Sequence, residues 1–230
     1  MNYLNALFQL AFPRACEGCG LALRSGEDLL CLRCTHELPV TYYQFYSANP
    51  VEKLFWGRIP VAQATAQYYF TKGSVIQHLM HQFKYRNNQE LGHTLGRLVG
   101  ESLRSTNRFT DIDALIPLPL NRVKEHKRGF NQAAVLCKGM SEVMLKPVYG
   151  AAVKRIVDTE TQTKKNREER WNNIKGKFAV CDRPLISHKH LLLVDDVITT
   201  GATLEACGHE LLQVEGTQLS IAALCISSRT

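Results

Sequence analysis

The sequence predicts an α/β protein with a mostly parallel sheet flanked by helices, and two stretches carry that prediction. Leu191–Val194 is a continuous apolar run, which is typical of a strand buried on both faces, and a helix is predicted after it at Leu204–Val214. Asp111–Leu118 begins the same pattern, since a helix is predicted after it at Ala133–Met144. Strands that alternate with helices along the chain are typical of parallel βαβ units.

The remaining elements follow from hydrophobic periodicity. Asp111–Leu118 is expected to be the first strand of the main sheet, and Thr41–Pro60 an irregular aromatic segment that packs on the protein. A short N-terminal helix would place Leu4, Leu7, Phe8 and Ala11 on one face. Other strands are predicted at Val61–Phe70, Val153–Val157, Phe178–Cys181, His190–Val197 and Gln218–Ile226, and other helices at Ser74–Tyr85 and Leu91–Leu103.

The composition is that of an ordinary globular protein with a basic balance. Of the 230 residues, 45% are hydrophobic and 21% are charged, and the net charge of +7 favours anionic partners such as a polyphosphate or nucleic acid. No apolar run is long enough to span a membrane, and Met1–Phe12 lacks the basic start of a signal peptide. We therefore expect a cytoplasmic protein. The sequence contains neither a P-loop nor a G-x-G-x-x-G motif, so ATP hydrolysis and dinucleotide binding have no motif support.

Four of the eight cysteines form two C-x-x-C pairs, Cys16/Cys19 and Cys31/Cys34. Two such pairs supply four thiolates, which is the tetrahedral ligand set that structural zinc prefers. A redox pair or an iron–sulfur centre is the alternative. The other four cysteines lie in apolar or helical contexts and are expected to be small buried hydrophobic residues: Cys137, Cys181, Cys207 and Cys225.

Two acids and a hydroxyl-rich turn follow the apolar run at Leu191–Val194. Ligands of open α/β sheets bind beyond the carboxyl ends of strands, and the start of a helix offers free N–H groups to a phosphate. Asp195 and Asp196 would repel a phosphate but suit neutral hydroxyls or a metal, whereas Thr199–Thr203, with Gly201, suits the phosphate itself. This predicts a sugar-phosphate site. The alternative is a buried strand with an acidic turn at its end.

A second anion site is predicted at the basic loop Asn121–Gln132, which follows the strand Asp111–Leu118 and contains Gly129 at its turn. A solvated basic loop is the alternative. The segment Asp158–Lys177 is strongly charged and has few apolar anchors, so it is expected to be mobile. A charged helical hairpin or a nucleic-acid-binding arm is the other interpretation of that segment.

The acid pair with its threonine loop resembles the phosphoribosyl-pyrophosphate (PRPP) motif of type I phosphoribosyltransferases. Taken together, motifs over nearly the whole chain resemble the ComF-like (GntX-like) family, which joins an N-terminal zinc module to such a domain. Besides the acid pair and its loop, the motifs that carry this resemblance are Cys16, Cys19, Cys31 and Cys34; Phe83-Lys84-Tyr85-Arg86; Pro117-Leu118-Pro119; Lys127–Ala133; and Thr161-Gln162 with Arg167 and Asn172.

The resemblance implies a type I phosphoribosyltransferase fold, structural Zn²⁺ on the four cysteines and Mg²⁺ bound with PRPP. It implies that PRPP is held by Asp195, Asp196, Val197, Thr199, Thr200, Gly201, Ala202 and Thr203. The pyrophosphate loop would contain Leu118, Arg122, Lys127 and Arg128. Asp195, Asp196, Lys127 and Arg128 would be the catalytic residues, and Asp158–Lys177 would be a flap that closes over the ligand.

The resemblance also implies three parts and a function. Residues 1–45 would form the N-terminal helix and zinc module, 46–110 a linker and helical hood, and 111–230 the phosphoribosyltransferase core. The expected reaction is displacement of pyrophosphate from PRPP by a nitrogen nucleophile, in a family linked to DNA uptake and natural transformation. The alternative is a non-catalytic PRPP-binding protein that associates with single-stranded DNA or a competence helicase. A homodimer is the expected assembly.

Overall fold

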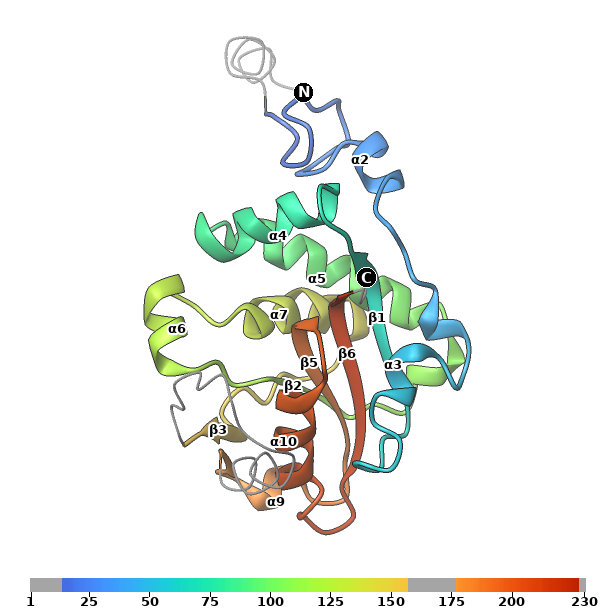
Figure 1. Cartoon of the computed structure of the whole chain (residues 1–230), viewed down its shortest axis with the longest axis vertical. Coiled ribbons are helices and arrows are strands. Elements are labelled where there is room, and N and C mark those ends of the chain that lie inside the picture. Colours follow the sequence, from blue (N-terminus) through green and yellow to red (C-terminus); the bar gives the residue numbers. More distant parts are fainter. Residues whose placement is uncertain (1–13, 157–176, 228–230) are drawn as a thin grey trace.

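The computed structural model describes residues 14–156 and 177–227 (Figure 1). The predicted N-terminal helix with Leu4 and Leu7, and nearly all of the predicted flap Asp158–Lys177, lie outside these ranges. Within the described ranges, no helix is both long and apolar enough to cross a membrane.

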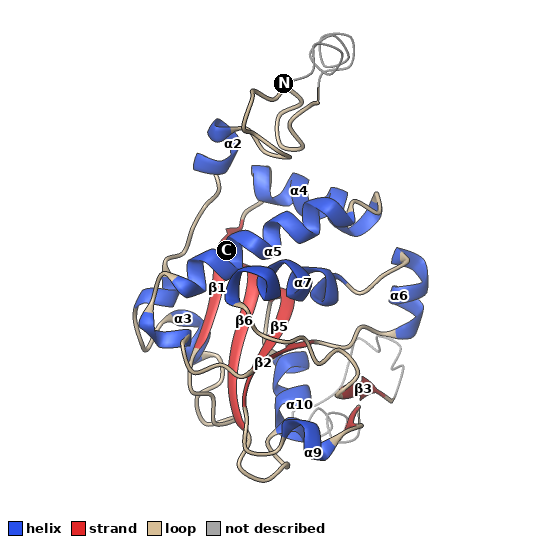
Figure 2. Ribbon diagram, turned by 180° about the vertical axis from the view of Figure 1, so that it is seen from behind, coloured by secondary structure: helices blue, strands red, loops and turns tan. Residues whose placement is uncertain are grey.

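A four-stranded parallel sheet forms the centre of the protein, in the order β1-β6-β5-β2 (Figures 1 and 2). Its strands are β1 (Ala64–Phe70), β2 (Ala114–Pro117), β5 (His190–Ile198) and β6 (Gln218–Ser227). The predicted parallel sheet is thereby confirmed. The prediction that the first strand lies at Asp111–Leu118 was wrong, because β1 precedes it and pairs with β6. Val61–Phe70 was predicted to be a strand, but the buried polar residues Thr65 and Gln67 interrupt the continuous apolar run that is typical of a parallel sheet.

The sheet therefore takes strands from both sides of residue 110. The division of the chain at residues 45 and 110 stays a prediction. Thr41–Pro60, which would join the first two parts, is firmly packed, since Val51 and Phe55 are fully buried. That segment contains two short helices, η1 (Tyr43–Phe45) and α3 (Pro50–Lys53).

Helices cover both faces of the sheet. Successive side chains of a strand point to opposite faces, and here the side chains on both faces are apolar. Leu192 and Val194 of β5 point into one apolar cluster, and Leu191 and Leu193 point into the other. Figure 2 shows the helices of the first face lying across the strands. That face carries α4 (Val75–Tyr85), α5 (Gln89–Arg104) and α7 (Gln132–Met144). The opposite face carries α3 and α10 (Ala202–Leu211).

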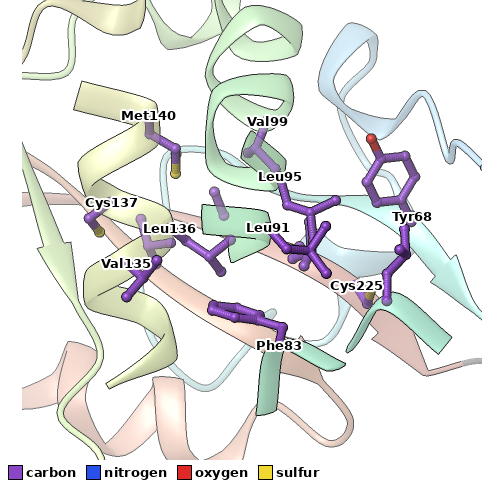
Figure 3. Close-up of a cluster of buried hydrophobic side chains, with 14 of the residues drawn as sticks. Tyr68, Phe83, Leu91, Leu95, Val99, Val135, Leu136, Cys137, Met140 and Cys225 are labelled. Atoms are coloured by element: carbon purple, nitrogen blue, oxygen red, sulfur yellow. The ribbon is translucent and has the colours of Figure 1, made fainter. Parts of the chain in front are cut away.

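The α5–α7 pair packs with its backbones in contact. A Cβ atom built on Gly139 would lie 2.1 Å from the backbone oxygen of His93, and one built on Gly96 would lie 2.3 Å from the oxygen of Leu136. Figure 3 shows the cluster beside this contact, where side chains of α5 and α7 meet Phe83 of α4. Glycine at these positions is therefore what allows α7 to lie this close to α5.

Two of the predicted strands lie away from the main sheet. β3 (Val153–Arg155) and β4 (Phe178–Val180) pair with each other, antiparallel, in a separate two-stranded sheet. They are only three residues long, and their apolar pattern cannot distinguish the two sheets. The remaining short helices are α2 (Leu32–His36), η2 (Asn107–Phe109), α6 (Arg122–Arg128) and α9 (Arg183–Ile186).

Three of the four scattered cysteines are buried as predicted: Cys137, Cys207 and Cys225. The prediction was wrong for Cys181, which is exposed. Cys181 lies just after the short strand β4, where the chain leaves the two-stranded sheet.

Candidate functional site

Asp195 and Asp196 lie near the carboxyl end of β5, an interior strand of the sheet. Successive side chains of a strand point to opposite faces. Asp196 therefore points to the side of α4, where it meets Lys84, while Asp195 points to the side of α10, where its charge acts on Cys207. The two acids thus have different surroundings.

Two cations converge on Asp196. The Nζ atom of Lys84 lies 2.9 Å from Oδ2 of Asp196, and Nη1 of Arg128 lies 3.8 Å from the same oxygen. The exposed fractions of the three side chains are 17% for Lys84 and 15% each for Asp196 and Arg128. Because little water reaches these groups, their charges interact more strongly than they would on an open surface.

Asp195 is the acid whose protonation the site changes most. Burial, followed by the charge of Asp196, raises the pKa of Asp195 to about 7. A hydrogen bond from the Asp196 N–H to Oδ1 of Asp195, 2.7 Å long, and the charges of Lys84 and Arg128 oppose that rise. Asp195 therefore changes between its neutral and charged forms close to physiological pH.

The turn after β5 exposes its hydroxyl groups beside the start of α10. Thr199, Thr200 and Thr203 are exposed, and Gly201 takes a positive φ of 74° as the residue that caps the helix. The Oγ1 atom of Thr200 accepts a hydrogen bond of 3.4 Å from the N–H of Ala202. The turn thus presents hydroxyls and the positive end of a helix dipole on one surface, which suits an anion.

Arg58 connects this turn to the rest of the protein, although no sequence motif indicated such a role. Its Nη1 atom donates to the backbone oxygens of Leu54, at 2.8 Å, and Thr200, at 3.0 Å, while Nη2 pairs with Glu205 of α10. Since Arg58 lies in the segment that was interpreted as an irregular linker, it carried no motif signal.

Gly201→Ala is expected to weaken this turn. The positive φ costs a residue with a side chain about 1 kcal/mol, and the new Cβ would lie 3.0 Å from Cε1 of the buried Phe55 ring. Urea unfolding should show a larger loss for Gly201→Ala than for Gly73→Ala, by about 1 kcal/mol. Gly73 also has a positive φ, but it has open space around its Cβ position. Equal losses in the two variants would contradict the close contact with Phe55.

The basic stretch after β2 is a helix, so the prediction of a loop was wrong. Oδ1 of Asn121 accepts the N–H groups of Val123, at 3.0 Å, and Lys124, at 3.2 Å, which starts α6. Gly129, with a φ of 81°, ends it, so the predicted turn at Gly129 is confirmed. These end signals outweighed the charged composition that had indicated a loop.

Of the predicted pyrophosphate residues, the structure places Arg128 in contact with the acid pair. Arg128 reaches Asp196, donates a 2.6 Å hydrogen bond to Oε1 of Gln132, and lies 5.9 Å from the ring centre of Tyr85. Arg122 and Lys127 are exposed on α6, and Leu118 is buried just after β2. Lys84 belongs to a motif of the family resemblance, but no local sequence pattern indicated its contact with Asp196.

The four N-terminal cysteines converge on one point. Their Sγ atoms all lie within 4.8 Å of one another, and the Sγ atoms of Cys19 and Cys31 are 3.8 Å apart. Sγ of Cys16 accepts the N–H groups of Gly18 and Cys31, each at 3.3 Å. Although burial raises it, such backbone hydrogen bonds lower the pKa of Cys16 to about 7. Four convergent sulfurs of this kind fit a tetrahedral metal ion.

This four-cysteine cluster is attached to α4, the helix that ends at the acid pair. Nε2 of Gln82 donates a 2.7 Å hydrogen bond to the backbone oxygen of Glu17, and it lies 3.0 Å from Nε2 of His78. A Cβ atom built on Gly18 would lie 3.2 Å from Cγ1 of Val75, the first residue of α4, so the cluster also packs closely on the start of that helix. One helix therefore contacts both candidate sites.

Comparisons with known proteins find a matching family model and several relatives. The family described as "Phosphoribosyl transferase domain" matches residues 131–229. Competence protein F of Haemophilus influenzae is 30% identical over 194 residues, which cover 82% of this chain and 80% of that protein. DNA utilization protein YhgH of Escherichia coli is 28% identical over 214 residues, covering 91% and 89%. Among solved structures, adenine phosphoribosyltransferase from Saccharomyces cerevisiae is 15% identical, with a TM-score of 0.40 over 62% of this chain and 72% of that chain.

Proposed function

This chain belongs to the ComF family of competence proteins that carry a phosphoribosyltransferase domain, and we propose that it binds PRPP and displaces its pyrophosphate with a nitrogen nucleophile. The observation that carries the proposal is the acid pair at the carboxyl end of an interior parallel strand, directly before the exposed start of α10. The acids that can bind the ribose hydroxyls therefore lie next to the turn that can bind the 5-phosphate, as the two ends of a ribose 5-phosphate require.

Each part of the ligand has its own set of residues in this proposal. The ribose hydroxyls bind Asp195 and Asp196, and the 5-phosphate binds the turn Thr199–Thr203. The pyrophosphate binds Arg128, which contacts Asp196, together with Arg122 and Lys127 of α6. When bound with PRPP, Mg²⁺ would neutralise part of the negative charge of the pyrophosphate.

In the proposed reaction a bond forms between the acceptor nitrogen and C1 of the ribose as the C1–oxygen bond breaks. Pyrophosphate leaves with the electron pair of that bond. Arg128 and Lys127 stabilise the negative charge on the leaving group. Ionised Asp196 and Asp195 stabilise the positive charge that develops on the ribose.

The test of binding is calorimetry with PRPP and Mg²⁺ on the variant Asp195→Ala/Asp196→Ala. We expect no detectable binding in this variant, because both groups that hold the ribose hydroxyls are lost. A matched control is Asp28→Ala/Asp111→Ala, which removes two exposed acids and should bind as the unchanged protein does. If the first variant keeps its circular dichroism spectrum and binds PRPP with normal affinity, Asp195 and Asp196 do not hold the ribose hydroxyls.

The test of transfer uses labelled PRPP with Mg²⁺ and candidate acceptors. Release of pyrophosphate that depends on ammonia, a nucleobase or single-stranded DNA would identify the nucleophile. Binding of PRPP without release in the presence of any of these acceptors would favour the second candidate function.

That second candidate is a non-catalytic PRPP-binding protein that associates with single-stranded DNA or a competence helicase. The net charge of +7 and the names of the relatives, competence protein F and DNA utilization protein YhgH, favour it. Binding to single-stranded DNA should weaken steeply as salt rises, because basic residues release counterions from the phosphates. A gel-shift series between low and physiological salt measures this, and a salt-insensitive shift would argue against it.

We propose that the four-cysteine cluster holds structural Zn²⁺, in keeping with a cytoplasmic location where thiols stay reduced. Cys16→Ser is expected to lower the zinc content and to destabilise the N-terminal module, since one of four ligands is lost. Metal analysis of the purified variant measures this, with Cys181→Ser as the control because Cys181 is exposed and outside the cluster. Unchanged zinc content in Cys16→Ser, or iron in the unchanged protein, would overturn the assignment.

A further inference from the structure

Lys84 is a charged residue of the candidate site that nothing above assigns to the ligand. It is next to last in α4, and its Nζ atom lies 2.9 Å from Oδ2 of Asp196. With only 17% of its side chain exposed, Lys84 has given up most of its contact with water. A lysine this enclosed requires a negative partner throughout the working cycle of the protein.

The positive charge around Asp196 exceeds what one carboxylate needs. Lys84 and Arg128 arrive from different helices, α4 and α6, and meet the same oxygen atom. Asp195 points to the other face of the sheet, towards Cys207 of α10, so Asp196 is the carboxylate that both cations contact directly. Two enclosed cations face one carboxylate, so one positive charge is left that a further anion can balance.

The position of Lys84 indicates which anion completes the cluster. Both cations reach one oxygen, so their nitrogen atoms lie close enough for a single pyrophosphate group to contact both. The 5-phosphate would lie elsewhere, at the start of α10. We propose that Lys84 binds the pyrophosphate of PRPP, with Asp196 holding it in place beside Arg128 before the ligand arrives. This inference rests on the proposed function, because it assumes that PRPP occupies the site.

A purely structural ion pair is the competing explanation. In that case Lys84 would serve only to orient Asp196, and its loss would disturb the binding of every ligand that uses the ribose hydroxyls. The two explanations differ for a ligand that has the ribose and 5-phosphate but lacks pyrophosphate. Ribose 5-phosphate is that ligand.

The experiment is calorimetry on Lys84→Met and Lys84→Arg with PRPP, ribose 5-phosphate and inorganic pyrophosphate, each with Mg²⁺. For Lys84→Met we expect the affinities for PRPP and pyrophosphate to fall about tenfold or more, and the affinity for ribose 5-phosphate to stay within about twofold. Lys84→Arg should keep most of the affinity for PRPP, because it keeps the charge. Lys138→Met, which removes an exposed lysine of α7, is the matched control and should change none of the three affinities.

Each other outcome overturns the inference in a recognisable way. An equal loss of affinity for ribose 5-phosphate and PRPP would show that Lys84 only positions Asp196. Unchanged PRPP affinity in Lys84→Met would show that Lys84 does not contact the pyrophosphate, while leaving the proposed function intact. Failure of the unchanged protein to bind either PRPP or ribose 5-phosphate would overturn the proposed function, and this inference with it. If Lys84→Met unfolds, Lys84→Gln, which also removes the charge but can still donate a hydrogen bond to Asp196, is measured with the same three ligands and judged by the same outcomes.

Discussion

Asp195→Asn is expected to stabilise the protein at pH 8, whereas Asp196→Asn is expected to destabilise it. The first effect follows from the raised pKa of Asp195, about 7, which burial and the neighbouring charge of Asp196 produce. An unfolded chain has its aspartate pKa near 3.9. Between about pH 4 and pH 7 the folded state therefore holds a proton that the unfolded state has released.

Stability must consequently fall as pH rises through that window, and it stays reduced above pH 7. Asparagine cannot ionise, so Asp195→Asn removes this loss and should add on the order of 2 kcal/mol to the free energy of unfolding at pH 8. Its side-chain oxygen can still accept the Asp196 N–H, which lies 2.7 Å from Oδ1 of Asp195. At pH 4, where the acid would be neutral in the folded state, the gain should nearly vanish.

Asp196→Asn acts in the opposite direction because it leaves Lys84 and Arg128 enclosed without a carboxylate. Removing one partner of a mostly buried ion pair is strongly unfavourable, and a loss of about 2 kcal/mol or more is expected. Urea unfolding of both variants at pH 4 and pH 8 measures the two effects. The interpretation of the acid pair fails if both substitutions shift stability in the same direction at pH 8. Asp195→Asn should also weaken PRPP binding, so its gain in stability would come at the expense of function.

Gly139→Ala is expected to destabilise the protein by about 3 kcal/mol, through the contact between α5 and α7. The added Cβ would lie 2.1 Å from the backbone oxygen of His93 and 2.8 Å from the backbone nitrogen of Arg97. Neither atom is at the end of a flexible side chain, so the two helices must move apart and open the apolar cluster between them. This loss outweighs the better helix propensity of alanine, about 1 kcal/mol.

Thermal or urea unfolding measures the effect, and Gly150→Ala is its matched control. The Cβ of that variant would meet only Pro117, at 3.9 Å, so the stability should change by less than about 0.5 kcal/mol. Gly96→Ala, whose Cβ would lie 2.3 Å from the oxygen of Leu136, should resemble Gly139→Ala. A stability of Gly139→Ala equal to that of the Gly150→Ala control would contradict the close approach of the helices.

The parts of the fold that the sequence predicted are those whose signal lies in one short stretch. The apolar run Leu191–Val194 marks a strand buried on both faces, and the acids that follow it mark the edge where ligands bind. Alternation along the strand also explains why Asp195 and Asp196 have different surroundings in the structure. Likewise, the spacing of the cysteine pairs was sufficient to predict the cluster.

The parts that could not be predicted depend on contacts between distant stretches. Lys84 meets Asp196 across more than a hundred residues of sequence, and Arg58 meets Thr200 in the same way. Neither contact leaves a local pattern. The basic helix α6 is a different case, since Asn121 and Gly129 were visible as end signals but were outweighed by its charged composition.

The attachment of α4 at both sites has a consequence for how the protein can be divided. Gln82 holds the Cys16–Cys19 loop and Lys84 holds Asp196, and two residues of a helix rise only about 3 Å along its axis. A helix turn is rigid over that length, so a rotation imposed at Gln82 displaces Lys84 as well. A shortened chain that lacks the four-cysteine cluster would lose the contact between Gln82 and Glu17 that holds this part of α4. Because Lys84 could then shift, the ligand affinity of the shortened chain would differ from that of the intact chain.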